Sequence, residues 1–315
     1  MRRLTLLASL LGACLLGAEP LRVFVSIVPQ LECVRRLAGD WVEAEALVPP
    51  GASPETYAPG PRQMSALGRA RLLVLIGAPF ERSLVRKVRG AFPGVELLDA
   101  TPGMAFRVMQ ADEASAHAHH HEEEDDEDDD GDEDDHGEEG GGHEEERHHV
   151  CHGHGEGDHD PHVWLSPLNM AVHARHVARA LGRLLPSRAA AIGERLAAYC
   201  AELEALDAEL RRSLAARPVR DVVVFHPAFG YLLERCGLRQ RVIELGGREP
   251  TGRHLGTVIR WARRRRVDCI YVQPQFSVSS ASVIAAEIGG KVMVLDPMPH
   301  PYLEGMRRLA RQLLR

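Results

Sequence analysis

Strand-like apolar runs alternate with amphipathic stretches along most of the chain. In the first half, the runs occupy residues 21–28, 42–48, 72–77 and 95–98, and stretches with helical spacing occupy residues 30–38 and 81–91. Strands that are covered on both faces are largely apolar, whereas surface helices repeat their apolar residues every three or four positions. The alternation of strands with helices predicts an α/β lobe built on a parallel sheet.

The same alternation returns in the second half. Strand-like runs occupy residues 221–225, 242–245, 269–272 and 292–295, and helical stretches occupy residues 229–236, 251–265, 278–288 and 302–314. We therefore expect a second, similar α/β lobe whose mainly parallel sheet is flanked by helices.

Two helical stretches lie between the predicted lobes. The first begins at Pro167 and ends where Pro186 interrupts it, and the second covers residues 187–216. About thirty residues at 1.5 Å each make a helix of roughly 45 Å, which can run the length of two small domains. The second stretch is expected to be a rigid connector between the lobes.

An acidic, histidine-rich segment separates the first lobe from these helices. Residues 117–160 hold 11 of the 17 histidines and 21 of the 45 acidic residues against one base, Arg147. A segment of this composition buries too little apolar surface to fold by itself and predicts a disordered loop. Imidazole and carboxylate are ligands for Zn²⁺ and its neighbours, so we expect loose metal binding here. The alternative is a polyanionic spacer that keeps the protein soluble.

The start of the chain resembles an export signal. Arg2 and Arg3 precede a short apolar stretch at residues 4–16, which is too short for a transmembrane helix. The sequence Leu11-Gly12-Ala13-Cys14 resembles a bacterial lipobox, which would leave Cys14 lipidated, whereas cleavage after Ala18 would release a soluble protein. Both interpretations place the protein in the periplasm or on the extracytoplasmic face of the cell membrane.

Export would place the remaining cysteines in an oxidising compartment. Their number is odd and their spacing wide, so no disulfide framework follows. Cys236 and Cys269 fall in the same half and are either bridged or buried as free thiols. Cys151 lies among histidines and is a candidate for the metal-binding set of the loop.

Candidate metal ligands stand at strand ends and in a rigid turn. His226 and Asp296 each follow a predicted strand, where open α/β sheets bind ligands. His162 precedes a proline-bounded helix, and Glu55 lies in the turn at residues 49–59, which holds four prolines. A single strand-end histidine is usually structural. Two imidazoles and two carboxylates together suit a four-coordinate Zn²⁺ site, or a Mn²⁺ site with a bidentate carboxylate.

Five short motifs occur in order along the chain. They are Pro54-Glu55-Thr56-Tyr57-Ala58-Pro59, Asp160-Pro161-His162-Val163-Trp164-Leu165, Phe225-His226-Pro227-Ala228-Phe229, Val272-Gln273-Pro274-Gln275-Phe276 and Leu295-Asp296-Pro297. Together they resemble the substrate-binding proteins of bacterial zinc and manganese ABC transporters, the cluster 9 or cluster A-I family, and in particular its zinc-specific branch with a His-rich acidic loop. The resemblance implies two α/β lobes joined by a rigid helix. It also implies a metal site between the lobes, with His162 from the first and His226 and Asp296 from the second.

The sequence departs from the family pattern at two positions. Glu55 stands where the family usually carries a histidine, and Gln273 stands where many relatives have glutamate. An additional oxygen ligand shifts preference toward harder cations such as Mn²⁺. The His-rich loop favours zinc, because such insertions go with zinc in this family. Zinc is the predicted ligand, with manganese as the alternative.

The resemblance implies capture of Zn²⁺ outside the cytoplasm and its delivery to an ABC permease. A zinc hydrolase is one alternative, but the chain has no His-Glu-x-x-His, no Gly-x-Ser-x-Gly and no phosphate-binding loop. His173 and His176 lie one helical turn apart and either pair as ligands or belong to a partly exposed helix face. A metal-binding surface adhesin is the other alternative. We expect a monomeric binding protein, not an enzyme.

Four consecutive arginines, Arg263 to Arg266, suggest either an anionic partner or a solvated helix end. Export argues against nucleic acid, and basic residues are favourable at a helix C-terminus.

The expected organisation of the whole chain has five parts. These are an export signal at 1–18, an N-terminal lobe at 19–116, the acidic loop at 117–160, the His162 motif with the connecting helices at 161–216, and a C-terminal lobe at 217–315.

Overall fold

The computed structural model describes residues 19–109, 159–244 and 250–315. The predicted export signal with Cys14, nearly all of the acidic segment and Cys151 lie outside these residues. At the end of the acidic segment, His159 and Asp160 are described, and Asp160 is fully buried.

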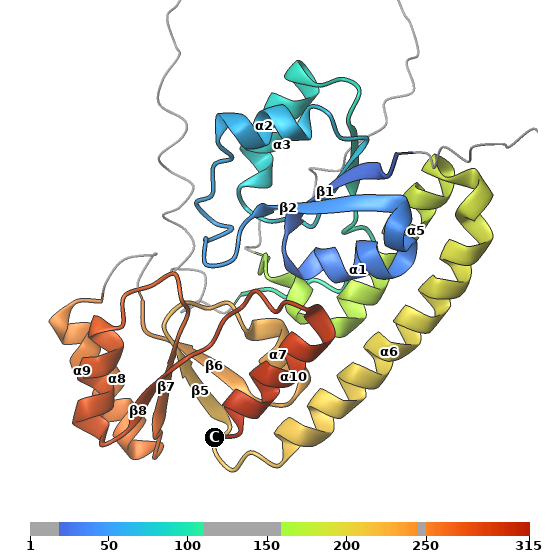
Figure 1. Ribbon diagram of the computed structural model, residues 1–315. Coiled ribbons are helices and arrows are strands. Elements are labelled where there is room, and N and C mark those ends of the chain that lie inside the picture. Colours follow the sequence, from blue (N-terminus) through green and yellow to red (C-terminus); the bar gives the residue numbers. More distant parts are fainter. Residues whose placement is uncertain (1–18, 110–158, 245–249) are drawn as a thin grey trace, which may run out of the picture.

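The N-terminal lobe is a four-stranded parallel sheet with the strand order β2-β1-β3-β4 (Figure 1). Its elements are β1 (Leu21–Ile27), α1 (Pro29–Ala38), the 3-10 turn η1 (Gly39–Trp41), β2 (Val42–Val48), α2 (Pro61–Leu67), β3 (Leu72–Leu75), α3 (Glu81–Ala91) and β4 (Glu96–Asp99). The central strand β3 is buried along its whole length, as its continuous run of Leu and Val predicts.

The C-terminal lobe repeats this topology with the strand order β6-β5-β7-β8, again all parallel. Its elements are β5 (Asp221–Val224), α7 (Gly230–Arg235), β6 (Arg239–Val242), α8 (Gly252–Arg264), β7 (Cys269–Val272), α9 (Ser279–Ile288), β8 (Lys291–Val294) and α10 (Tyr302–Leu313). In each lobe the first strand lies between the second and the third. The expectation of two similar α/β lobes is therefore confirmed.

Four of the described elements connect the lobes, and the longest of them, α6, lies along the side of both (Figure 1). They are η3 (Val163–Leu165), α5 (Pro167–Leu184), η4 (Pro186–Arg188) and α6 (Ala189–Ala215). The 27 residues of α6 make a helix of about 40 Å. Helix α6 packs against α5 and contacts α1 of the first lobe and α10 of the second. The predicted connector is thus present and braces both lobes.

The lobes also meet directly, through the turn that follows His162. Trp164 is fully buried, and its Nε1 donates a hydrogen bond to the carbonyl of Pro297 at 2.8 Å. The hydroxyl of Tyr302 donates to the carbonyl of Trp164, also at 2.8 Å. Apolar residues of both lobes join one buried cluster, so the turn that carries His162 is held from both sides.

One strand was predicted at the wrong place. The expected strand at residues 242–245 is found at Arg239–Val242. Strand β6 pairs only with β5 and is an edge strand, and of its four residues only Gln240 is buried. Polar residues are tolerated at a sheet edge, so the apolar run at 242–245 marked the end of the strand instead of its middle.

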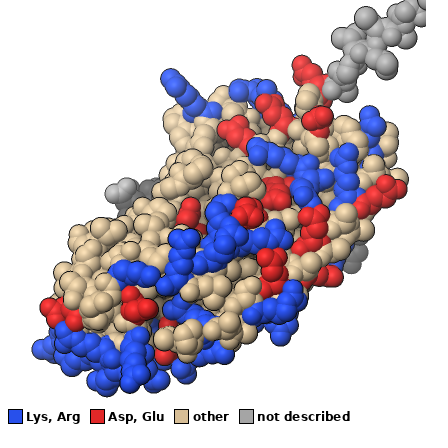
Figure 2. All heavy atoms as spheres, turned by 60° about the horizontal axis from the view of Figure 1, so that its bottom comes forward, with Lys and Arg blue, Asp and Glu red and all other residues tan. Residues whose placement is uncertain are grey.

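The described cysteines are all buried free thiols, namely Cys33, Cys200, Cys236 and Cys269. The alternative of a Cys236–Cys269 bridge is not realised. Helix α8 ends at Arg264, and the four residues Arg263 to Arg266 are all exposed, as expected for a solvated helix end. Figure 2, turned to bring the base of the molecule forward, shows basic side chains gathered on that side. None of the helices in the described ranges has both the length and the apolar character needed to cross a bilayer.

Candidate metal centre

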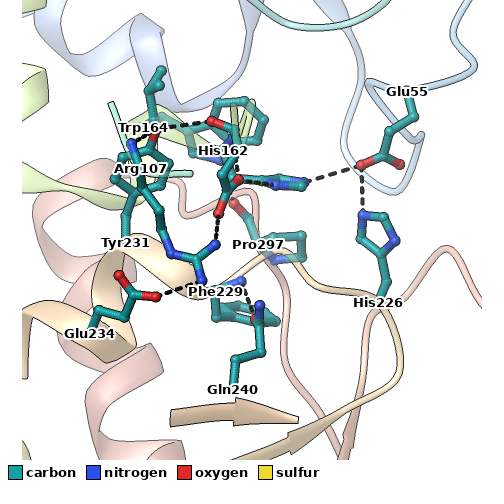
Figure 3. Close-up of polar contacts among 12 residues, drawn as sticks. Glu55, Arg107, His162, Trp164, His226, Phe229, Tyr231, Glu234, Gln240 and Pro297 are labelled. Carbon is teal, nitrogen blue, oxygen red and sulfur yellow. Dashed lines mark hydrogen bonds and ion pairs between the residues drawn. The ribbon is translucent and has the colours of Figure 1, made fainter. Parts of the chain in front are cut away.

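Glu55 is held by the proline-rich turn between β2 and α2. The Oγ atom of Ser53 accepts a hydrogen bond from the main-chain nitrogen of Glu55 and donates one to Glu55 Oε2. The ring of Tyr57 packs edge-on against Phe80 at a centroid distance of 5.8 Å, which fixes the turn to the lobe. With Oε2 occupied in this way, Oε1 of Glu55 is directed at His162 and His226 (Figure 3).

His162 is oriented by Asp160. Oδ1 of Asp160 accepts hydrogen bonds from the main-chain nitrogen of His162 at 2.9 Å and from its Nδ1 at 2.8 Å. The ring also packs edge-on against Trp164, with 5.2 Å between centroids. Because a carboxylate accepts the Nδ1 proton, Nε2 is the nitrogen that His162 offers to a ligand.

His226 follows β5, and three contacts from the same lobe fix it. Its Nδ1 donates to Oε1 of Glu244 at 2.6 Å. Gln273 holds the main chain of His226 with both amide atoms, since its Oε1 accepts from the His226 nitrogen at 3.1 Å and its Nε2 donates to the His226 carbonyl at 2.6 Å. The imidazole stacks on the ring of Phe276 at 5.1 Å. His226 therefore also presents Nε2.

Both imidazoles converge on one carboxylate oxygen. Oε1 of Glu55 lies 2.8 Å from Nε2 of His226 and 3.1 Å from Nε2 of His162. The side chains are 6%, 2% and 2% exposed for Glu55, His226 and His162. Among the described residues these three form the one cluster of potential metal ligands, with donor atoms within 4.8 Å of one another. Bonds of about 2.0 Å to zinc would need only a small separation of these atoms.

The three groups stabilise one another as ions. Burial by itself would lower the pKa of His226, but the charge of Glu55 and the hydrogen bonds to Glu244 and Glu55 outweigh burial and raise that pKa to about 10. Burial likewise opposes a raised pKa of His162, and the hydrogen bonds to Asp160 and Glu55 overcome it. Burial would raise the pKa of Glu55, yet the charge of His226 and its hydrogen bonds hold that pKa well below its ordinary value.

Asp296, the fourth predicted ligand, does not belong to this cluster. Its Oδ1 accepts a hydrogen bond from the main-chain nitrogen of Met298 at 2.9 Å. Burial raises the pKa of its carboxyl group. Asp296 lines a cavity of about 640 Å³ between the lobes, which is also bounded by Val28 and Pro50 of the first lobe and Arg308 of the second. The coordination of a metal by Asp296 stays a prediction.

Two of the groups that shape this site were not found from the sequence. Glu244 was not singled out, and Asp160 was noted only as part of a motif. Glu244 is 1% exposed, and its place between the apolar residues Ile243 and Leu245 is the sequence signal that could have identified it. Gln273 is 1% exposed, and it supports the backbone of His226 through neutral hydrogen bonds.

His173 and His176 do not form a ligand pair. His173 is fully buried, and neither of its ring nitrogens has a hydrogen-bond partner. His176 donates from Nε2 to the carbonyl of Pro102 at 2.8 Å. The expectation of a partly exposed helix face was wrong for His173, because α5 is covered by both α1 and α6.

The described residues form two α/β lobes, with a cluster of three potential metal ligands where the lobes meet. Residues 23–315 match the family described as "Zinc-uptake complex component A periplasmic", or ZnuA, and the chain belongs to this family. It is a family of metal-binding solute-binding proteins and not a family of enzymes.

Individual relatives agree with this assignment. A crystal structure of ZnuA is 30% identical, superposes with a TM-score of 0.76, and the match covers 94% of this chain and 98% of that chain. A ZnuA deletion mutant with zinc bound is also 30% identical, with a TM-score of 0.74 and coverage of 94% and 97%. The zinc-binding lipoprotein AdcA of Streptococcus pneumoniae is 26% identical over 285 residues, which is 88% of this chain and 50% of AdcA. The chain thus spans about half the length of this curated relative.

Proposed function

We propose that this protein captures Zn²⁺ outside the cytoplasm and delivers it to an ABC permease. Glu55, His162 and His226 supply two nitrogens and one oxygen, and Asp296 supplies a second oxygen when the lobes adjust around the ion. The observation that carries the proposal is the convergence of both Nε2 atoms on Glu55 Oε1 while each Nδ1 is held by a buried carboxylate. Histidines held in this way are prepared to coordinate a metal.

Zinc is favoured over manganese by the nitrogen content of the site. Two imidazoles in a buried, compact cluster suit a four-coordinate borderline cation, whereas manganese prefers more oxygen ligands. Family membership and the zinc-bound relative support the same choice. Glu55 keeps the oxygen share high enough for measurable manganese binding.

The proposal includes the partners and location of the protein. The permease is its protein partner, the binding protein acts as a monomer, and nucleic acid has no part in its work. Cys14 is proposed as a lipid anchor on the extracytoplasmic face, by analogy with the lipoprotein AdcA. The site acts by binding, and no substrate is transformed there.

A competition titration against a chromophoric chelator tests this function. In a variant that lacks residues 117–158, we expect one tightly bound zinc per chain, because the three clustered ligands lie outside that segment. His226→Ala should abolish tight binding in this background, and Asp296→Ala should weaken it if Asp296 coordinates. Full-length protein serves as the control and should bind further zinc ions weakly. Loss of all tight zinc on removal of the acidic segment would refute the proposed site.

A further inference from the structure

A row of charged side chains runs from His162 into the C-terminal lobe. Asp160 uses Oδ1 for His162 and Oδ2 for Arg107, whose Nη1 lies 2.7 Å away. Arg107 also donates from Nη2 to Oε1 of Glu234 on α7, at 2.6 Å (Figure 3). One guanidinium group thus joins the residue that orients His162 to a helix of the opposite lobe.

The position of Arg107 is built by both lobes. The side chain of Arg107 is 6% exposed and that of Asp160 is 0% exposed. The hydroxyl of Tyr231 accepts from the main-chain nitrogen of Arg107 at 3.2 Å and donates to the carbonyl of Asp160 at 2.9 Å. The nitrogen of Asp160 in turn donates to the carbonyl of Arg107 at 3.0 Å. The chain segments around Arg107 and Asp160 therefore hold each other in place.

Gly230 shows how closely α7 approaches this guanidinium. A Cβ atom at Gly230 would lie 2.3 Å from both Cζ and Nη1 of Arg107. The backbone at the start of α7 thus packs directly on the guanidinium, and a side chain at this position would displace it. The close packing indicates that the fold accommodates the Arg107 guanidinium in a specific buried position, unlike an ion pair at the surface.

The arrangement has a consequence for His162. A fully buried carboxylate needs a charged partner, and the planar guanidinium holds Asp160 in one orientation while it binds Glu234 with its other nitrogen. The orientation of Asp160 decides where its Oδ1 meets Nδ1 of His162, and hence where Nε2 points. His226 is oriented separately, by Glu244 and Gln273.

We propose that Arg107 is a positioning residue that couples the docking of α7 to the orientation of His162 in the metal site. The inference rests on the proposed zinc-binding function, and it concerns a residue that acts on His162 through Asp160. It predicts that the two histidines respond differently when Arg107 is changed.

The test compares Arg107→Met with Arg235→Met. Arg235 neighbours Glu234 on α7 and also forms a two-pronged ion pair, with Nε and Nη2 donating to Asp207 at 2.9 and 2.8 Å, although its side chain is 42% exposed. Loss of a group that orients a metal ligand typically lowers metal affinity by about tenfold or more. We expect a loss of about tenfold in zinc affinity for Arg107→Met and less than twofold for Arg235→Met. Equal losses would mean that Arg107 acts only through general stability.

A second readout separates positioning from stability. Imidazole ¹⁵N NMR signals of His162 should move further in Arg107→Met than those of His226, both without metal and with zinc. Arg107→Lys should recover part of the affinity, because a single ammonium group can hold Asp160 but cannot also reach Glu234 in the same geometry. If Arg107→Met does not fold, Arg107→Lys and Glu234→Gln take its place and should each shift the His162 signals. Unmoved His162 signals in the folded variants would overturn the inference.

The two proposals fail in different ways. If the wild-type protein binds no zinc tightly, the proposed function is refuted, and the metal-free NMR spectra still decide whether Arg107 orients His162. If wild-type zinc binding is tight and Arg107→Met leaves both the affinity and the His162 signals unchanged, only the role of Arg107 is refuted.

Discussion

Glu55 Oε1 lies 2.8 Å from His226 Nε2, although 171 residues separate the two along the chain. The same oxygen lies 3.1 Å from Nε2 of His162. The atoms that would bind a cation therefore hold one another through shared protons in its absence. Binding of a metal to these atoms must displace protons, so the site exchanges protons for metal.

Zinc affinity should fall as the pH falls. The pKa of His226 is raised to about 10, since the charge of Glu55 and the bonds to Glu244 and Glu55 overcome the opposing effect of burial. At pH 7 the metal-free site thus carries a proton that zinc must displace. We expect the apparent affinity to drop about tenfold per pH unit for each proton released. Titration calorimetry in buffers of different ionisation enthalpy measures how many protons are released for each zinc ion bound. Binding without any proton release would contradict the prediction.

The same pKa predicts the pH dependence of the metal-free fold. Because the pKa of His226 is higher in the folded protein than its ordinary value of 6.5, its ion pair with Glu55 stabilises the fold fully below pH 6.5. This contribution is lost as the pH rises toward 10. Urea unfolding of metal-free protein between pH 6.5 and 9.5 should show the decline, and His226→Asn should reduce it. An equally steep decline in the variant would place its origin elsewhere.

Glu55→His should move the selectivity of the site toward zinc. The change replaces an oxygen ligand with a nitrogen, which manganese binds less readily than zinc does. We expect zinc affinity to be kept and manganese affinity to fall by about tenfold or more, an estimate from the preferences of the two ions. Glu55→Ala is the matched control and should weaken both. Competition titrations with the two metals measure the ratio, and unchanged manganese binding in Glu55→His would show that Glu55 is no ligand.

Glu244→Gln should weaken zinc binding without removing a ligand. Glu244 accepts the Nδ1 proton of His226 at 2.6 Å and thereby fixes the ring and its tautomer. Replacement of such an outer partner costs about 10- to 100-fold in metal affinity. Zinc titration checks the loss, and ¹⁵N NMR should show a larger change in the environment of His226 than in that of His162. Glu209→Gln is a suitable control, because Glu209 pairs with Arg307 on a part-exposed surface far along α6.

The sequence predicted the fold well where local pattern and burial agree. Continuous apolar runs became the inner strands β3 and β7, and the helix expected from Pro167 begins there, with Ser166 Oγ accepting from the nitrogen of Asn169 as an N-cap. Strand β6 was predicted at the wrong residues because the strand itself is mostly polar and its position is decided by pairing with β5. Local pattern carries little information about an edge strand.

The site was predicted in part, for a similar reason. Glu55, His162 and His226 stand beside prolines and strand ends, which mark them in the sequence. Glu244 and Arg107 gain their roles only through contacts with residues that are 18 and 53 positions away, His226 and Asp160. Such contacts depend on how segments pack in three dimensions, and the spacing of residues along the chain does not predict them.

His173→Leu should stabilise the protein, and more so in acid. His173 is fully buried in α5 with neither ring nitrogen hydrogen-bonded, and burial lowers its pKa to about 3. A buried polar atom without a partner costs about 1–3 kcal/mol, so an apolar side chain of similar size should raise the free energy of unfolding by at least about 1 kcal/mol at pH 7.5.

The pH dependence of this gain follows from the lowered pKa. Below pH 6.5 the unfolded chain protonates His173, whereas the folded protein does not do so until about pH 3, so the wild type loses stability across this range. His173→Leu removes that loss, and its advantage should grow between pH 7.5 and pH 5. Urea unfolding at both values measures the difference. His176→Leu is the matched control on the same helix, and it should destabilise slightly because it removes the hydrogen bond to Pro102. A gain that is equal at the two pH values would show that His173 also titrates in the folded protein, and its burial would then not explain the effect.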